Sequence, residues 1–319
     1  LALAAFAGCV YAVARLRGRA RDTRRQSALA AREERVAWLF VAPALACVGL
    51  IAIFPLGWTL WESLHDRDLR APWRGAEFVG LANYVEALTS ERFRAALAHT
   101  AFFAAASVTI ELALGMGLAL ALDGAYRGRG VVRAAVLIPW AVPTVVAALV
   151  WRFLFDARAG VVNTALMGVG AIDRPVAWLA HETAAWAPVI LADVWKTTPF
   201  VALLLLAGLQ SIDGALYDAA RVDGATAWQR FTLVTLPLLR PTLAAALLFR
   251  ALDALRVFDL VYALTGGGPG TATEPIALLT FDALLQNLRF GYGSALGVAV
   301  FVATFALAWF FVRVLGADP

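Results

Sequence analysis

Six long apolar stretches constrain what this sequence can fold into more than any other feature. A helix needs about 20 mostly apolar residues to cross the hydrocarbon layer of a bilayer. Hydrophobic residues make up 61% of the chain and charged residues 16%, whereas soluble domains average about 45–50% and about 25%. We therefore expect an all-α, polytopic membrane protein with six core transmembrane helices. The predicted spans are Val36–Trp61, Leu97–Leu122, Ala134–Phe155, Trp186–Leu209, Thr242–Leu264 and Ser294–Leu315.

A seventh, shorter apolar run occupies residues 1–14 and is followed by a basic segment, residues 15–35. As a helix the run would be about 21 Å long, so it fits an extra N-terminal helix or the end of a truncated span. Its basic residues follow the apolar run, which is the wrong order for a cleaved signal. We expect residues 1–35 to form a separate N-terminal segment and residues 36–319 to form the transmembrane domain.

The arginines indicate how the predicted spans are oriented. Of the 27 basic residues all but Lys196 are arginine, and the net charge is +4. Because the arginines lie beside apolar runs, they favour topology control over nucleic-acid binding. The side that carries residues 15–35 holds 15 arginines and the other side holds 8. We therefore expect the first side, which includes the connector at about residues 211–241, to be cytoplasmic.

Several kinds of chemistry are not supported by the residues present. A phosphate-binding loop of the form G-x-x-x-x-G-K-[ST] cannot be built around Lys196, because no glycine precedes it within reach. The three histidines are scattered without metal-ligand spacing, and no nucleophile–base arrangement is visible. Cys9 and Cys47 both lie in apolar runs, so we interpret them as small hydrophobic residues. We expect no enzyme, no metal site and no bound cofactor in this chain.

The connector between the fourth and fifth spans is long and patterned. Good helix-forming residues run over Ile212–Val222, and Asp213 can cap their start. Gly224 can adopt a left-handed conformation. A second short helix should follow, with Pro237 and Pro241 limiting how the chain re-enters the membrane. This predicts a helix–turn–helix on the cytoplasmic face, and from these features alone a purely structural hairpin is an equal alternative.

The spacing within the connector resembles the EAA loop of ATP-binding-cassette importer permeases. That loop reads E-A-A, three residues, G, nine residues, I-x-L-P. Here Asp218, Ala219 and Ala220 are followed at the same spacing by Gly224 and by VTLP at residues 234–237, so aspartate replaces glutamate and valine replaces isoleucine. The stretches LIPWAVPTVVAALVWRFLF, ADVWKTTPFVALLLLAGL and LFRALDALRVFDLVYALTGGGPG resemble the MalF/UgpA-like sugar permeases, most of all the trehalose- and maltose-type permeases. The resemblance begins near residue 36.

The resemblance implies a type I importer permease fold and a set of partners. The chain would be one subunit beside a second permease subunit, two ATPase subunits that bind ATP and Mg²⁺, and an extracytoplasmic sugar-binding protein. It would lie in the inner membrane of a bacterium, in contact with lipid. The turn would be a coupling helix that docks in a cleft of an ATPase subunit. The coupling residues implied are Asp218, Ala219, Ala220, Asp223, Gly224 and Ala225.

Ionisable side chains occur inside the predicted spans, where each costs about 2.5–3.5 kcal/mol on insertion scales. They are Glu111, Arg152, Asp193, Lys196, Arg250, Asp253, Arg256 and Asp259. Asp193 and Lys196 are three residues apart and can pair. From Arg250 to Asp259 the sign alternates every three residues, and on one helix such a row slides around the axis. We therefore expect that the four residues of this row do not all line one pocket. Glu111 is expected to be a buried partner of one of the cations.

These charges fit either neutralising ion pairs that fix helix packing or a polar pocket for a sugar. In the family that the chain resembles, the translocation pocket lies between the spans that flank the EAA loop. The resemblance implies a substrate pathway, with Trp195 and Phe200 available to face the sugar ring. Its residues are Lys196, Thr197, Phe200, Arg250, Asp253 and Ala254.

The alternating charges favour a neutral disaccharide such as trehalose or maltose, moved into the cytoplasm by alternating access. Glycerol-3-phosphate or another polyol is the alternative, because a phosphate would favour Arg250, Arg256 and Lys196. An ion-coupled secondary transporter is a further alternative, but no internal repeat of the connector or of the charged row supports it.

Overall fold

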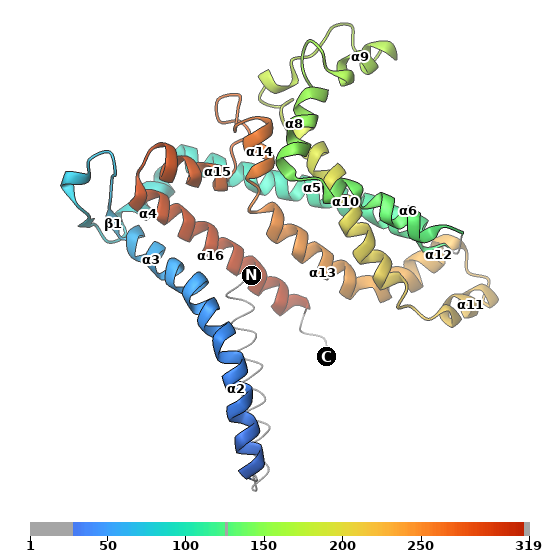
Figure 1. Cartoon of the computed structure of the whole chain (residues 1–319). Coiled ribbons are helices and arrows are strands. Elements are labelled where there is room, and N and C mark those ends of the chain that lie inside the picture. Colours follow the sequence, from blue (N-terminus) through green and yellow to red (C-terminus); the bar gives the residue numbers. More distant parts are fainter. Residues whose placement is uncertain (1–27, 125–126, 316–319) are drawn as a thin grey trace. The chain divides into compact units, whose positions relative to one another are not determined.

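The computed structural model describes residues 28–124 and 127–315 (Figure 1). The chain forms two compact units, which we describe separately. One contains the described residues up to Tyr84 together with Arg289–Val298, and the other contains Val85–Leu288 and the residues from Ala299 onward. The predicted apolar run at residues 1–14, most of the basic segment and Cys9 lie outside the described residues.

The first unit is built on one long apolar helix. Helix α2 (Ala28–Val48) continues through a π-helical turn, η1 (Gly49–Ile53), into α3 (Phe54–Ser63). A two-stranded antiparallel ribbon follows, made by β1 (His65–Asp66) and β2 (Glu77–Phe78), with a 3₁₀ turn, η2 (Pro72–Arg74), between the strands. Within the described residues this ribbon is the one sheet in an otherwise helical structure.

Buried polar contacts hold the ribbon to the end of α3. The side-chain amide of Asn83 donates to the carbonyl oxygens of Ser63 and His65, at 2.9 and 3.0 Å. The guanidinium of Arg67 donates to the buried carboxylate of Glu62 at 2.7 Å. These contacts satisfy the carbonyl oxygens of Ser63 and His65 and one carboxylate oxygen of Glu62, and so they stabilise the reversal of the chain after α3.

The second unit is a bundle of helices around α5, α10 and α13. Its long helices pack through apolar clusters, one around Phe103, Val189 and Leu264 and another around Leu205 and Leu239. The bounds are α4 (Ala82–Thr89, which begins in the first unit), α5 (Glu91–Asp123), α6 (Arg129–Val136), α7 (Ile138–Ala141), α8 (Thr144–Leu154), α9 (Val161–Gly168), η3 (Trp178–Ala180), α10 (Trp186–Leu209), α11 (Gly214–Val222), α12 (Ala227–Arg230), η4 (Phe231–Thr235), α13 (Leu236–Ala254), α14 (Asp259–Leu264), α15 (Ile276–Phe281), η5 (Asp282–Gln286) and α16 (Phe290–Leu315, which begins in the first unit).

The expected all-α polytopic architecture is confirmed, with a correction to the number of continuous spans. Among the described residues five helices are long and apolar enough to cross a membrane. The third predicted span, Ala134–Phe155, is instead divided among α6, α7 and α8. Val142 has an extended conformation, with φ −67° and ψ 132°, because the ring of Pro143 disfavours a helical residue before it. The five helices are Val36–Ser63, Glu91–Asp123, Trp186–Leu209, Ala227–Ala254 and Phe290–Phe311.

The fifth predicted span, Thr242–Leu264, starts and ends in the wrong places. The helix is continuous from Ala227 to Ala254 and contains both prolines that were expected to limit re-entry. A π-helical turn, η4, ends two residues before Pro237, and its wider spacing accommodates a residue that has no N–H and crowds the preceding turn. The second short helix of the expected hairpin is therefore the first part of this long helix.

Helices α5 and α10 approach closely at a glycine. A Cβ added to Gly115 would lie 2.7 Å from Cγ1 of Val201, whereas Gly117, two residues further along α5, has nothing within 4 Å of that position. Both substitutions to alanine gain the same helix propensity of about 1 kcal/mol. We expect Gly115→Ala to unfold at a lower temperature than Gly117→Ala, because overpacking costs about 1–3 kcal/mol. Thermal unfolding of both variants in detergent measures the difference, and equal midpoints would contradict the tight contact.

Candidate functional site

A cavity of about 140 Å³ lies in the second unit, where α5, α8, α10 and α13 meet. Five of the six predicted pathway residues line it, and the sixth, Phe200, does not. Phe200 instead stacks on Trp140 with ring centroids 5.8 Å apart. Trp195, the other predicted aromatic residue, also lies outside the lining and packs near Trp151 at 6.1 Å. The lining residues are Phe103, Thr144, Asp193, Lys196, Thr197, Arg250, Asp253, Ala254, Arg256, Val257, Phe258, Asp259 and Leu260.

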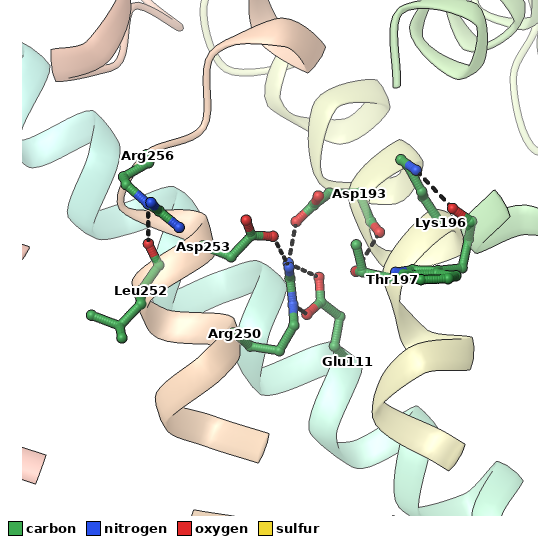
Figure 2. Close-up of polar contacts among 9 residues, drawn as sticks. Glu111, Asp193, Lys196, Thr197, Arg250, Leu252, Asp253 and Arg256 are labelled. Carbon is green, nitrogen blue, oxygen red and sulfur yellow. Dashed lines mark hydrogen bonds and ion pairs between the residues drawn. The ribbon is translucent and has the colours of Figure 1, made fainter. Parts of the chain in front are cut away.

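The guanidinium of Arg250, one of the lining residues, lies among several carboxylates (Figure 2). It is 3% exposed and contacts three carboxylates from three helices. Nε and Nη2 donate to the two carboxylate oxygens of Glu111 on α5, at 2.5 and 3.0 Å. Nη2 also donates to Asp193 on α10 at 3.0 Å, and Nη1 donates to Asp253 at 2.5 Å. The expected burial of Glu111 beside a cation is confirmed, with Glu111 fully buried.

These ion pairs determine which polar atoms in the cavity remain free to bind a ligand. A guanidinium has five N–H donors, and four of those of Arg250 already reach carboxylate oxygens. Arg250 therefore cannot offer the paired donors that grip a sugar diol. The carboxylate of Asp253 is 66% exposed at the cavity, and within the described residues the guanidinium of Arg256 makes one hydrogen bond, from Nε to the carbonyl of Leu252. Asp253 and Arg256 therefore retain free hydrogen-bonding atoms.

The charged row does not behave as the sequence predicted. Its members Arg250, Asp253, Arg256 and Asp259 all line this one cavity, so the expectation that they could not is wrong. The reason is that α13 ends at Ala254 and α14 begins at Asp259, so the row is not on one helix. The irregular connection between these helices turns Arg256 and Asp259 back toward the cavity, which helix periodicity could not reveal.

Lys196 is held by backbone carbonyls. Its ammonium donates to the carbonyl oxygen of Trp140 at 3.1 Å and to that of Val142 at 2.8 Å. The spacing allows Asp193 and Lys196 to pair, but in the structure the carboxylate of Asp193 pairs with Arg250 instead. Thr197 also turns inward, and its hydroxyl donates to the carbonyl of Asp193 at 2.7 Å.

The predicted helix–turn–helix is present between α11 and α12. The side chain of Asp213 accepts from the N–H of Ala215 at 2.9 Å and caps α11. Gly224 has φ +77°, and nothing lies within 4 Å of where its Cβ would be. Thr226 and Gln229 form a reciprocal capping box that starts the next helix. The turn is thus defined by its own hydrogen bonds.

Two large apolar side chains are exposed on the surface of this turn. Val222 is 87% exposed and Trp228 is 71% exposed. Beside them Asp218 and Arg221 form an exposed ion pair at 2.6 Å. Of the other predicted coupling residues Ala219, Asp223 and Gly224 are exposed, and Ala220 and Ala225 are half-buried. An apolar surface with a polar border is typical of a docking site for another protein.

Comparison with known proteins assigns the chain to a family. Residues 112–315, which include the turn and nearly all of the cavity lining, match the family described as binding-protein-dependent transport system inner membrane component. The chain belongs to this family. It is thus a multi-pass inner-membrane permease of an ATP-binding-cassette importer, a transport subunit without catalytic activity of its own. ATP is bound by partner ATPases and not by the permease.

Curated relatives cover almost the whole permease. The trehalose/maltose transport system permease protein MalF of Thermococcus litoralis is 44% identical over 92% of this chain and 98% of its own length. The trehalose transport system permease protein SugA of Mycobacterium tuberculosis is 40% identical over 89% of this chain and 90% of its own. The relatives are therefore bacterial and archaeal.

Solved structures confirm the fold of the permease. A chain of a bacterial ABC transporter involved in the import of the acidic polysaccharide alginate aligns with a TM-score of 0.75 and 26% identity, over 90% of this chain and 98% of that one. A second structure contains the alginate transporter in complex with an alginate pentasaccharide-bound periplasmic protein, with a TM-score of 0.74 and 27% identity over 88% of this chain and 95% of that one. The permease is thus a component of a transporter that works with a binding protein.

Sequence reasoning missed several residues of the cavity. Thr144 was hidden within an apolar run, and its only signal was the preceding proline, which starts a new helix there. Arg256 and Asp259 were recognised as charged but assigned to a continuous helix. Among the described residues, no group of three or more histidine, cysteine, aspartate or glutamate side chains is placed to hold a metal ion.

Proposed function

We propose that this permease moves a neutral disaccharide, trehalose or maltose, into the cytoplasm through the cavity around Arg250. The single observation that carries the proposal is the lining of that cavity. It offers free carboxylate and guanidinium atoms from Asp253, Arg256 and Asp259, which suit sugar hydroxyls as acceptors and donors. The names of the relatives from Thermococcus and Mycobacterium point to the same substrate class.

The charges of the cavity favour a neutral substrate over glycerol-3-phosphate. Three cationic and three anionic side chains line it, and Glu111 adds a further carboxylate behind Arg250. The carbonyls that Lys196 contacts do not neutralise its charge, but with Glu111 included the four carboxylates outnumber the three cations, so the site carries a net negative charge. A substrate with a net negative charge would meet uncompensated carboxylates at short range, where the local dielectric screens poorly.

The turn at Gly224 is, in this proposal, the contact that transmits ATP-driven motion. It lies in the cytoplasm, as the arginine distribution indicates, and its coupling residues Asp218, Ala219, Ala220, Asp223, Gly224 and Ala225 enter a cleft of an ATPase subunit. The assembly contains a second permease subunit, two ATPase subunits and an extracytoplasmic sugar-binding protein, in the inner membrane of a bacterium. Residues 36–319 form the transmembrane domain, and residues 1–35 precede it.

Reconstitution tests the proposal. We expect liposomes that contain the permease with its second permease and two ATPases, and the binding protein on the outside, to accumulate trehalose or maltose when ATP is inside. Uptake of glycerol-3-phosphate by the same liposomes should be at background. Uptake that proceeds without ATPase subunits would contradict the importer and favour an ion-coupled secondary transporter. Uptake of glycerol-3-phosphate in place of either disaccharide would contradict the substrate class.

A further inference from the structure

Two side chains of α10 contact the segment at which the helix is interrupted, between α7 and α8. Lys196 donates to the carbonyls of Trp140 and Val142, and Phe200, one turn further along α10, stacks on the ring of Trp140. Both contacts converge on the break at Pro143. Both residues were expected to face substrate; in the structure Phe200 faces this segment instead, whereas Lys196 both contacts this segment and lines the cavity.

The break creates the need for such a contact. In a continuous helix the carbonyl of Trp140 would accept from the N–H of residue 144, but Pro143 and the extended Val142 end α7 first. An unpaired carbonyl away from water costs about as much as a lost hydrogen bond. The ammonium of Lys196 supplies the missing donors, and its positive charge suits the carbonyl end of a helix.

The gripped segment also forms part of the cavity wall. Thr144, the first residue of α8, lines the cavity, and so does Lys196 itself. An ammonium has three N–H donors, and two of them reach the carbonyls. A sugar hydroxyl in the cavity can accept from the third donor or compete for the other two. The hydrogen bonds of one side chain therefore link occupancy of the cavity to the position of the break.

We propose that Lys196 and Phe200 form a clamp that holds the helix break at Pro143 against α10 and so sets how far α8 closes over the cavity. Lys196 is in this sense a positioning residue. The inference rests on the proposed function in one respect, namely that the molecule in the cavity is a sugar. The clamp itself is a property of the chain, so it can be tested without any sugar.

The experiment uses Thr144→Cys in the assembled transporter, with Cys9 and Cys47 changed to serine. The rate at which a small water-soluble thiol reagent labels residue 144 is measured in detergent, without sugar and without ATP. We expect Lys196→Met to raise this rate about tenfold or more, the size expected for losing hydrogen bonds from a charged donor. Lys196→Arg should keep the rate near that of the parent, since a guanidinium can also donate to two carbonyls.

Two further variants make the result specific. Arg133→Met removes another cation that donates to a helix carbonyl, that of Leu122 at 2.9 Å, and should leave the labelling of residue 144 unchanged. Phe200→Leu retains Lys196 but loses the ring stack on Trp140, so it should raise the labelling rate. It provides a second test of the clamp if Lys196→Met fails to assemble.

Unchanged labelling in Lys196→Met and Phe200→Leu would overturn the clamp, and so would an equal rise in Arg133→Met. A Lys196→Met variant that only raises the KM for sugar uptake would also overturn it, because that result would make Lys196 a sugar ligand and nothing more. Failure of the parent transporter to take up any disaccharide would refute the proposed substrate and leave the labelling result standing.

Discussion

We expect Gly224→Trp to abolish ATP-driven uptake while the permease still folds and inserts. Gly224 has φ +77° and open space around it, so a side chain there meets no atom of the chain. Its own cost is the strain of a left-handed residue, about 1–2 kcal/mol. An indole would, however, occupy the exposed surface that the proposed coupling contact needs. We expect uptake to fall to background and purified ATPase subunits to be lost from the complex on size-exclusion chromatography.

The chain provides a matched control for this variant at Gly128. That residue has φ +84° and likewise nothing within 4 Å of a Cβ, and it lies in the connection between α5 and α6, which the arginine distribution predicts to be on the same side of the membrane. Gly128→Trp introduces the same indole at a comparable backbone conformation outside the turn. It should retain most of the uptake and all of the ATPase. A Gly224→Trp variant that transports as well as Gly128→Trp would refute the coupling role.

Arg250→Met should be the most destabilising single change in the cavity. It leaves the carboxylate of Glu111, which is fully buried, and that of Asp193 without their cation. Removing one partner of a buried ion pair typically costs about 3–5 kcal/mol, because the remaining charge is buried without compensation. We expect the thermal midpoint of the variant in detergent to fall well below that of the parent, with loss of uptake.

Arg256→Met is the control for Arg250→Met, because it also replaces an arginine of the cavity lining with methionine. Arg256 is exposed at the cavity and donates to a single backbone carbonyl, so its removal should change the free energy of unfolding by less than about 1 kcal/mol. Adding Glu111→Gln to Arg250→Met removes one of the stranded charges and should recover part of the lost stability. If Arg250→Met unfolds at the same temperature as Arg256→Met, the buried cluster does not contribute to stability as described.

Local chemistry made the turn predictable from sequence. An aspartate before a run of helix formers predicts a cap, and Asp213 caps α11. A glycine after that run predicts a left-handed residue, and Gly224 is one. These features depend on neighbours a few residues away, so no knowledge of the remaining fold is needed. That an ATPase subunit binds this turn stays a prediction.

The cavity could be predicted only in part, because its contacts join distant parts of the chain. Glu111 and Arg250 are 139 residues apart, and nothing in either local sequence identifies the other. The broken span shows a different limit. Counting apolar residues over Ala134–Phe155 indicates one helix, although Pro143 carried the contrary signal. No proline or glycine in the sequence marks the end of α13 at Ala254. Because the helix ends there, all four residues of the charged row can face the cavity.

The unbroken helix from Ala227 to Ala254 has a mechanical consequence. It begins three residues after Gly224 and carries Arg250 near its far end, a separation of about 35 Å along the axis at about 1.5 Å per residue. A helix of that length can act as a lever arm, and its π-helical turn η4 marks a point near its start where it can bend. A tilt of about 5° at its start would displace the guanidinium of Arg250 by about 3 Å, the length of a hydrogen bond. A small tilt at the turn would thus shift Arg250 by a distance comparable to the length of its hydrogen bonds to Glu111 and Asp193.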